Sequence, residues 1–205
     1  MRIEFGTAID PNTSDAVLAF CEAMRQQPID GLVDCAPAYT TAIVHYDPRR
    51  IGYEAACREI DLRLERSHSL PPISGRTVEI PVRYGGAEGP DLEFVAHAHD
   101  LTPEDVVRLH SSADYRVYML GFLPGFPFLG GLPDALVTPR RPTPRIRVPA
   151  GSVAIGGAQT GVYPVESPGG WRLIGRTEVV LYDPERPQRA ALSPGDRVKF
   201  VPRSD

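Results

Sequence analysis

The sequence predicts an α+β fold in two domains, the first built from strands and helices and the second mostly from strands. Proline and glycine are unusually frequent, with 22 Pro and 19 Gly among 205 residues. Because Pro fixes φ and Gly frees it, this composition excludes a protein made of long helices. Helical and strand periodicities alternate in the first half of the chain, and beyond about His110 short strand-like segments between Pro/Gly turns replace them.

The elements predicted for the first half follow the order βαββαβ. Apolar residues at helical spacing predict helices through Val17–Met24 and Tyr53–Leu64. Period-two alternation or a β-rich composition predicts strands near residues 2–5, 32–34, 39–46 and 78–84. This order is the signature of a ferredoxin-like domain, although Pro81 indicates that the last strand is an edge strand or belongs to the next domain. The turn-rich stretch 85–90 predicts the boundary, with domains at 1–86 and 87–205.

The second domain begins with one helix and continues as strands. Thr102 is a good N-cap, Pro103 suits the first helical position and Asp105 suits the third, so a helix is predicted through about His110. Strand candidates follow at 115–119, 146–148, 153–155, 171–173, 178–182 and 197–201. Short strands between regularly spaced turns favour a closed barrel over a sandwich.

Composition and charge exclude several functional classes. The net charge is -4, and Arg and acidic residues are interspersed, which argues against nucleic-acid binding. No stretch approaches the roughly 18 apolar residues of a membrane span, and the N-terminus has no apolar core of a secretion signal. Three cysteines without a C-x-x-C spacing indicate free thiols in a reducing cytosol, so we expect a cytoplasmic protein.

Missing motifs narrow the chemistry further. The sequence has no P-loop and no G-x-S-x-G elbow, and its only lysine, Lys199, lies in a predicted strand rather than in a turn that could carry biotin. We therefore expect no biotin on this chain. His97, His99 and Asp100 could form half of a metal site, but no second cluster of ligands completes it, so we expect no metal.

An aromatic and glycine-rich segment, GFLPGFPFLGG at 121–131, suits neither a helix nor a regular strand. One interpretation is a rigid loop whose rings fill a barrel end. The other is an apolar wall for a ligand, with glycine letting the ligand approach the backbone. The wall would consist of Phe122, Pro124, Gly125 and Phe126.

Arginine alternates with proline in the segment 138–147, which holds four Arg and three Pro. Such a run is either a solvated face or a binding segment. Proline keeps the backbone extended, and guanidinium forks suit a carboxylate or phosphate. Arg145 is our candidate for this contact.

Glycine-rich turns follow and are open to two interpretations. They are corners of the barrel, or they present backbone N–H groups and polar side chains to an anion or an oxyanion. The candidate residues are Gly151, Ser152, Gln159, Thr160, Ser167, Gly169 and Gly170.

These motifs together resemble a known family. The runs GFLPGFPFLGGLP (121–133), TPRRPTPRIRVPAGSVAIGGAQTGVYPVESPGGWRLIGRT (138–177) and PGDRVKF (194–200) are similar to allophanate hydrolase subunit 1, also known as the B-type subunit of 5-oxoprolinase and as sporulation-kinase inhibitor. The likeness extends weakly into the first half, at 34–47 and 80–93. Relatives usually carry extra residues before the counterpart of Ile3, so we expect that the true start lies upstream or that the first sheet lacks a strand.

The resemblance implies a fold, a partner and an activity. It implies a cyclophilin-like barrel after the α/β domain, and a larger partner similar to allophanate hydrolase subunit 2 or to the C-type subunit of 5-oxoprolinase. The family activity is ATP-dependent opening of the 5-oxoproline lactam, or a related reaction on a small amide. With no P-loop here, partner chains would bind ATP partly or wholly.

The resemblance also implies roles for the candidate residues. The aromatic wall would face Arg145, Gln159, Thr160 and Ser167. Arg145 would hold a carboxylate or phosphate, while Gln159 and Thr160 would orient the amide. Two other functions stay open: an inhibitor that binds a sensor histidine kinase through the aromatic loop, and a remnant of a biotin-dependent carboxyltransferase that needs a biotinylated partner.

Overall fold

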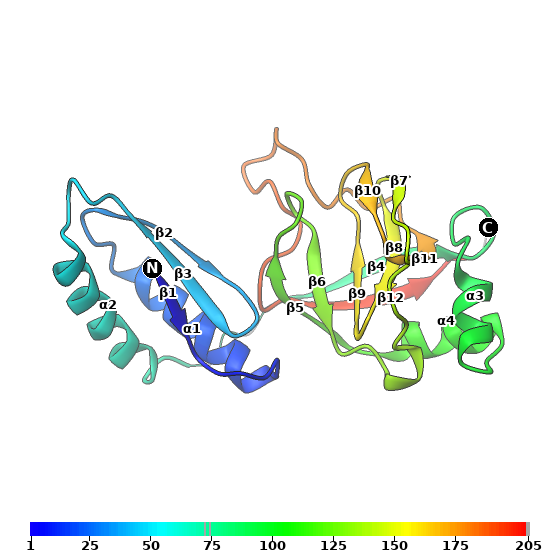
Figure 1. The fold of residues 1–205 in the computed structure, drawn as a ribbon, viewed down its shortest axis with the longest axis horizontal. Helices are drawn as coiled ribbons and strands as arrows, with labels where there is room; N and C mark the ends of the chain where they lie inside the picture. The colour runs from blue at the N-terminus through cyan, green and yellow to red at the C-terminus, as the bar shows by residue number, and fades with distance from the viewer. Residues whose placement is uncertain (72, 74, 204–205) are drawn as a thin grey trace. The chain divides into compact units, whose positions relative to one another are not determined.

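The computed structural model describes residues 1–71, 73 and 75–203, and the chain divides into two compact units, Met1–Ser74 and Gly75–Asp205. The first unit contains β1 (Arg2–Glu4), α1 (Pro11–Gln26), β2 (Leu32–Pro37), β3 (Thr41–Tyr46) and α2 (Tyr53–Ser67). The second contains β4 (Thr77–Tyr84), α3 (Leu92–Ala98), α4 (Pro103–Ser112), β5 (Tyr115–Leu120), β6 (Pro127–Gly130), the short 3₁₀ helix η1 (Asp134–Leu136), β7 (Arg145–Val148), β8 (Ser152–Gly156), β9 (Gln159–Val162), β10 (Ser167–Gly169), β11 (Arg172–Arg176) and β12 (Arg197–Pro202) (Figure 1).

The first unit is a split βαβ arrangement. Strand β3 lies between β1 and β2 and is antiparallel to both, so β1 and β2 run parallel with one strand between them. Helix α1 begins where the Asp10 side chain accepts hydrogen bonds from two backbone N–H groups of the first turn. Its buried face packs on β3 and α2, and the Cys21 sulfur lies 3.2 Å from that of Cys35, both as free thiols.

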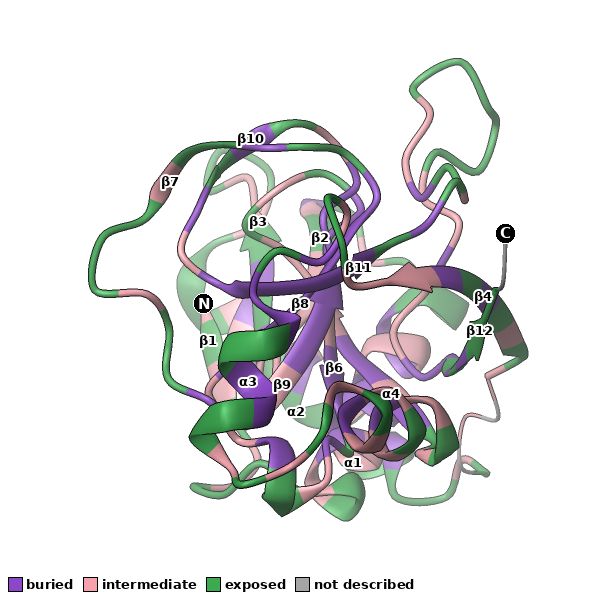
Figure 2. Cartoon of the chain, turned by 90° about the vertical axis from the view of Figure 1, so that its right-hand side faces the viewer, coloured by how far each residue is buried: buried purple, intermediate pink, exposed green. Residues whose placement is uncertain are grey.

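The second unit is a closed barrel with the strand order β11-β4-β12-β5-β6-β9-β8, in which β8 pairs with β11 to complete the ring. Strand β12 runs parallel to β4, and the other barrel pairs are antiparallel. Along β4 the side chains alternate, with Ile80 and Val82 fully buried and Glu79 and Pro81 exposed. Figure 2 shows the buried residues concentrated on the strands of the barrel.

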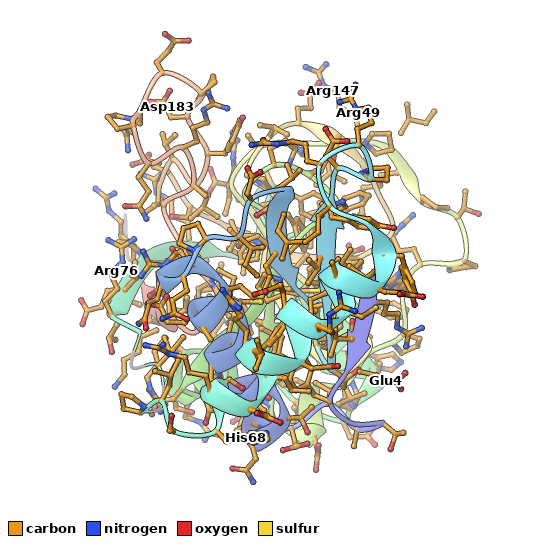
Figure 3. All side chains as sticks on the ribbon, turned by 90° about the vertical axis from the view of Figure 1, so that its left-hand side faces the viewer. Glu4, Arg49, His68, Arg76, Arg147 and Asp183 are labelled. Carbon is orange, nitrogen blue, oxygen red and sulfur yellow. The ribbon has the colours of Figure 1, made fainter. Side chains whose placement is uncertain are left out.

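The helices of the second unit pack against the barrel strands. Thr102 and Asp105 form a reciprocal capping box at the start of α4, as the sequence predicts. Helix α4 contacts β12, and α3 contacts β11. Charged side chains such as Arg147 and Asp183 project away from the ribbon (Figure 3). Among the residues with described placement, no helix is both long enough and apolar enough to cross a membrane.

The α+β class with a barrel is confirmed, and the domain boundary needs correction. The strand at 77–84 pairs with β11 and β12, so it belongs to the barrel and the division falls near residue 74 rather than 86. The first unit therefore has the βαββα part of the predicted βαββαβ order. The segment 178–182 is not a strand, and β6, β9, β10 and α3 are elements that the sequence patterns did not predict.

Candidate functional site

The loop between β5 and β6 carries an exposed phenylalanine and a buried one. Phe122 has a φ of 65° and is 65% exposed, while Phe126 is buried. Gly125 has a φ of 77°, and a Cβ there would lie 3.1 Å from the Leu181 carbonyl oxygen, so the turn requires glycine. The loop closes on itself through a hydrogen bond from the Phe126 N–H to the Leu123 carbonyl oxygen, at 3.0 Å. The segment is therefore a compact turn between β5 and β6 and not a continuation of either strand.

Phe126 is the centre of a group of packed rings that we call the aromatic cluster. The cluster consists of Phe122, Phe126, Phe128, Tyr163 and Trp171. Its ring centroids lie 5.0 to 5.6 Å from that of Phe126, in tilted or edge-to-face geometry that aromatic rings favour. Gly156 makes room for the indole, because a Cβ at that position would lie 2.5 Å from Trp171 ring atoms.

The aromatic cluster lines a pocket of about 350 Å³, which we call the aromatic pocket. Its other lining residues are Arg140, Arg141, Pro144, Pro168, Gly169 and Gly170. The volume lies at the lower end of the range for small-molecule sites, roughly 300–1,000 Å³. Phe122, Phe126, Gly169 and Gly170, which the sequence nominated separately, meet here.

Two guanidinium groups face the aromatic pocket, and neither is that of Arg145. The Arg140 guanidinium carbon lies 5.6 Å from the centre of the Trp171 ring, in a cation–π arrangement. Arg141 also lines the pocket, and one of its terminal nitrogens lies 3.3 Å from a carboxylate oxygen of Asp91. The pocket therefore combines flat apolar faces with positive charge, which suits a small ring that carries a carboxylate.

Asp91 holds the arginine segment in place, and the sequence did not reveal this role. It is 4% exposed and accepts hydrogen bonds from both terminal nitrogens of Arg145, at 2.8 and 3.0 Å, and from the Leu173 N–H at 2.7 Å. Burial raises the pKa of the Asp91 carboxyl, but the hydrogen bonds from Arg145 and Leu173 outweigh it, so the net pKa lies below its ordinary value. The guanidinium fork of Arg145 therefore binds a carboxylate. This carboxylate is the side chain of Asp91 and not part of a ligand.

Gln159 and Thr160 do not meet at the rim of this pocket. Neighbours on a strand point to opposite faces, and on β9 the Thr160 side chain is fully buried in the barrel while Gln159 is partly exposed. The Thr160 hydroxyl donates to the Ala154 carbonyl oxygen at 3.0 Å. Neither residue lines the aromatic pocket, so the structure does not bring them together with Arg145 as a catalytic group.

The barrel interior holds a polar chain centred on His110. Its Nε2 lies 2.9 Å from Thr160 Oγ1 and its Nδ1 lies 2.8 Å from the Tyr84 hydroxyl. Because Thr160 uses its own hydrogen on Ala154, Nε2–H must donate to Thr160 and Tyr84 donates to Nδ1. Burial lowers the pKa of His110 to about 3, so the ring is neutral at pH 7. The sequence offers one signal that His110 is buried, because it lies four residues after Val106 and therefore on the same face of the helix.

None of the remaining candidates lines the aromatic pocket. Ser152 is buried at the start of β8, and the hydroxyl of Ser167, on β10, donates to the neighbouring Pro168 carbonyl oxygen at 3.1 Å. Pro124 is exposed on the loop outside the pocket lining. Gly151 lines a different hollow. Within the described part of the chain, no group of three or more His, Cys, Asp or Glu side chains could hold a metal ion.

Among the described residues that line the aromatic pocket, none has a side chain that would act as a base at neutral pH. Besides the two arginines, its ionisable group among the described lining residues is Tyr163, and burial raises the pKa of that hydroxyl. The pocket can therefore bind and orient a ligand, whereas proton transfer needs groups from elsewhere.

Comparison with known proteins agrees with the fold and the motifs. A family model described as the carboxyltransferase domain, subdomains C and D, matches residues 1–192. The chain belongs to this family. It is 44% identical to the B-type subunit of 5-oxoprolinase from Bacillus subtilis (strain 168) over 211 residues, which cover 98% of this chain and 88% of that relative. The resemblance that the motifs indicate is thereby confirmed.

Solved structures of related proteins show the same fold within longer chains. The crystal structure of TTHA0988 matches with a TM-score of 0.88 and 44% identity, covering all of this chain and 40% of that one. The Kluyveromyces lactis urea carboxylase matches with a TM-score of 0.79 over 99% of this chain and 21% of that one. At 20% identity, the second match shows the fold alone.

Proposed function

We propose that this chain is the B-type subunit of an ATP-dependent 5-oxoprolinase, and that it binds the lactam in the aromatic pocket beside a larger partner protein. The observation that carries the proposal is a small aromatic pocket with Arg140 and Arg141 in its wall. The similarity to the 5-oxoprolinase relative from Bacillus subtilis supports it. A cytoplasmic location, where ATP is available, is part of the proposal.

The substrate suits the pocket chemically. 5-Oxoproline is a five-membered lactam that carries one carboxylate. The ring would lie in the aromatic pocket against Phe122, which is 65% exposed, and the carboxylate would take the guanidinium of Arg140, because that of Arg141 already contacts Asp91. Opening the lactam consumes one water, and hydrolysing ATP to ADP and phosphate consumes a second. The groups that activate these waters and hold most of the nucleotide would come from the partner, because the chain has no P-loop.

The test is a reconstituted assay with a mutation in the pocket. The chain is co-expressed with the products of the neighbouring genes, and 5-oxoproline-dependent release of phosphate and glutamate is measured. Arg140→Gln should raise KM for 5-oxoproline about tenfold or more, since it removes a charged contact. Arg147→Gln is the matched control, because Arg147 is 76% exposed and pairs with Glu166 at 2.6 Å. Absence of turnover with all partners present would remove the proposal.

Trp171 offers a direct readout of binding. It is the only tryptophan of the chain and lies in the pocket wall, so its fluorescence reports on this site alone when the chain is titrated without partners. We expect the emission to change with 5-oxoproline and the change to be weakened in Arg140→Gln. If the emission of Arg140→Gln changes as much as that of the wild type, the lactam binds somewhere other than the aromatic pocket.

One observation favours the inhibitor of a sensor histidine kinase as a second candidate. Phe122 is 65% exposed at the mouth of the pocket, where a protein partner could cover it. This function predicts lower kinase autophosphorylation when the chain is added, and recovery of autophosphorylation with Phe122→Ser. A kinase that is unaffected by the chain would exclude it.

A further inference from the structure

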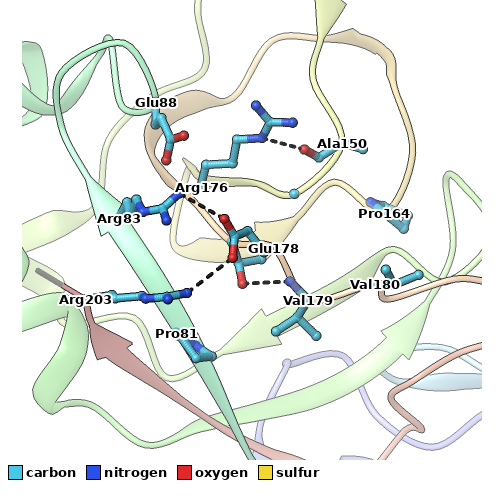
Figure 4. Close-up of a pocket in the computed structure, with 12 residues that line it drawn as sticks. Pro81, Arg83, Glu88, Ala150, Pro164, Arg176, Glu178, Val179, Val180 and Arg203 are labelled. Atoms are coloured by element: carbon cyan, nitrogen blue, oxygen red, sulfur yellow. Dashed lines mark hydrogen bonds and ion pairs between the residues drawn. The ribbon is translucent and has the colours of Figure 1, made fainter. Parts of the chain in front are cut away.

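The barrel unit has a second and larger hollow, of about 690 Å³, beside β4 and the segment that follows β11 (Figure 4). It shares none of its described lining residues with the aromatic pocket. Three arginines line it, Arg83 on β4, Arg176 at the end of β11 and Arg203 just after β12. The hollow therefore gathers positive charge in a chain whose net charge is -4.

Two of these arginines share one carboxylate. Arg83 donates to one oxygen of Glu178 at 3.0 Å, and Arg203 donates to the other at 3.2 Å (Figure 4). The Glu178 side chain is 68% exposed and stands in a segment outside any helix or strand. Such an exposed ion pair is held weakly, so an external anion can displace this carboxylate.

The third arginine is held in place by the backbone. Arg176 Nε donates to the Ala150 carbonyl oxygen at 2.9 Å, which restrains the plane of the guanidinium and leaves its two terminal nitrogens without a part in this bond (Figure 4). Gly151 turns the chain at this point with a φ of 82°, and a Cβ there would collide with the Thr177 carbonyl oxygen. The glycine is therefore required for the turn that holds Arg176.

The charge balance of the hollow selects the ligand. Among the described lining residues, three arginines against Glu88 and Glu178 leave one positive charge, and two remain when the Glu178 side chain turns into the solvent. Two positive charges match a phosphate dianion, and planar guanidinium forks bind phosphate oxygens bidentately. We propose that this hollow is an oxyanion site that binds a phosphoryl group, either free phosphate or the phosphate of a nucleotide, in the place of the Glu178 carboxylate.

The proposal goes beyond the proposed function and is tested on the full chain without partners. Inorganic phosphate and Mg·ATP are titrated separately by calorimetry at low ionic strength, where screening is weak. Arg176→Gln should weaken binding about tenfold or more, because it removes charge-assisted hydrogen bonds. Glu178→Gln should strengthen binding, because it removes the competing carboxylate. Arg186→Gln is the control, since Arg186 pairs with Asp183 outside the hollow.

Each outcome supports or overturns the phosphoryl site. Tighter binding of Mg·ATP than of phosphate assigns the site to a nucleotide, and binding of phosphate alone assigns it to the free ion. The proposal is overturned if neither ligand gives a heat of binding at millimolar concentration. It is also overturned if Arg186→Gln loses as much affinity as Arg176→Gln, or if Glu178→Gln binds more weakly than the wild type. If Arg176→Gln fails to fold, Arg203→Gln takes its place. Failure here leaves the lactam assay and the Trp171 titration unaffected, so the two proposals fail separately.

Discussion

Asp91→Asn should destabilise the barrel unit, because one carboxylate holds several groups there. Asp91 is 4% exposed and accepts hydrogen bonds from both terminal nitrogens of Arg145, from one of Arg141 and from the backbone N–H of Leu173. Removing one member of a buried ion pair costs about 3–5 kcal/mol. The Arg145 and Arg141 side chains keep 21% and 32% exposure, and asparagine can still accept one hydrogen bond, so we expect about 2–3 kcal/mol.

The assay is thermal unfolding followed by circular dichroism, with Asp114→Asn as the control, because Asp114 is 57% exposed and pairs with Lys199, which is 52% exposed. A loss of this size lowers the Tm of a domain this large by roughly 5–12 °C. The pKa of Asp91 is lowered on folding, so its ionised form stabilises the folded state. This contribution to the free energy of unfolding is present above the unfolded pKa of about 3.9 and is lost as the pH falls below it. The difference between wild type and Asp91→Asn should therefore shrink below about pH 4. A variant with wild-type Tm at neutral pH would refute this account of the arginine segment.

Two further predictions concern buried groups. His110 has a folded pKa of about 3 against about 6.5 unfolded, so the wild type should lose stability as the pH falls from 6.5 toward 3, by roughly 1.4 kcal/mol per pH unit. Chemical denaturation between about pH 6 and pH 4 should show this slope, and His110→Gln should lack it; the same slope in both proteins would contradict a neutral buried ring. Gly156→Ala places a Cβ 2.5 Å from Trp171 ring atoms and should cost about 1–3 kcal/mol while shifting the tryptophan emission. An unshifted emission spectrum would show that the indole does not rest on this glycine.

Local patterns predict much of the secondary structure. The apolar spacing around Val17 and Tyr53 and the Thr102–Asp105 cap each lie in the helix that was expected. Such signals depend on neighbours within one or two helical turns, so they can be read from the chain directly. Phe122 and Phe126 are candidates for a ligand wall on the sequence alone, and both line the aromatic pocket.

Pairing between distant segments could not be read in this way. Strand β4 looks like the end of the first domain in sequence, but its partner β12 lies 120 residues further on, where Arg197 pairs with Thr77. The role of Asp91 depends on Arg145, 54 residues away, and an isolated aspartate in a turn carries no sign of it. The inward direction of Thr160 follows from the register of β9 against β8, which the turn-rich sequence does not specify.

The place of β12 in the ring has a consequence for synthesis on the ribosome. The helices and sheet of the first unit are complete once Ser67 has been made, so this unit can fold while the rest is still being translated. The barrel cannot, because β4 and β5 both pair with β12 and keep an open edge until residues 197–202 emerge. A nascent chain stalled before that point would carry unpaired strand edges, which are the places where other chains add on and aggregate.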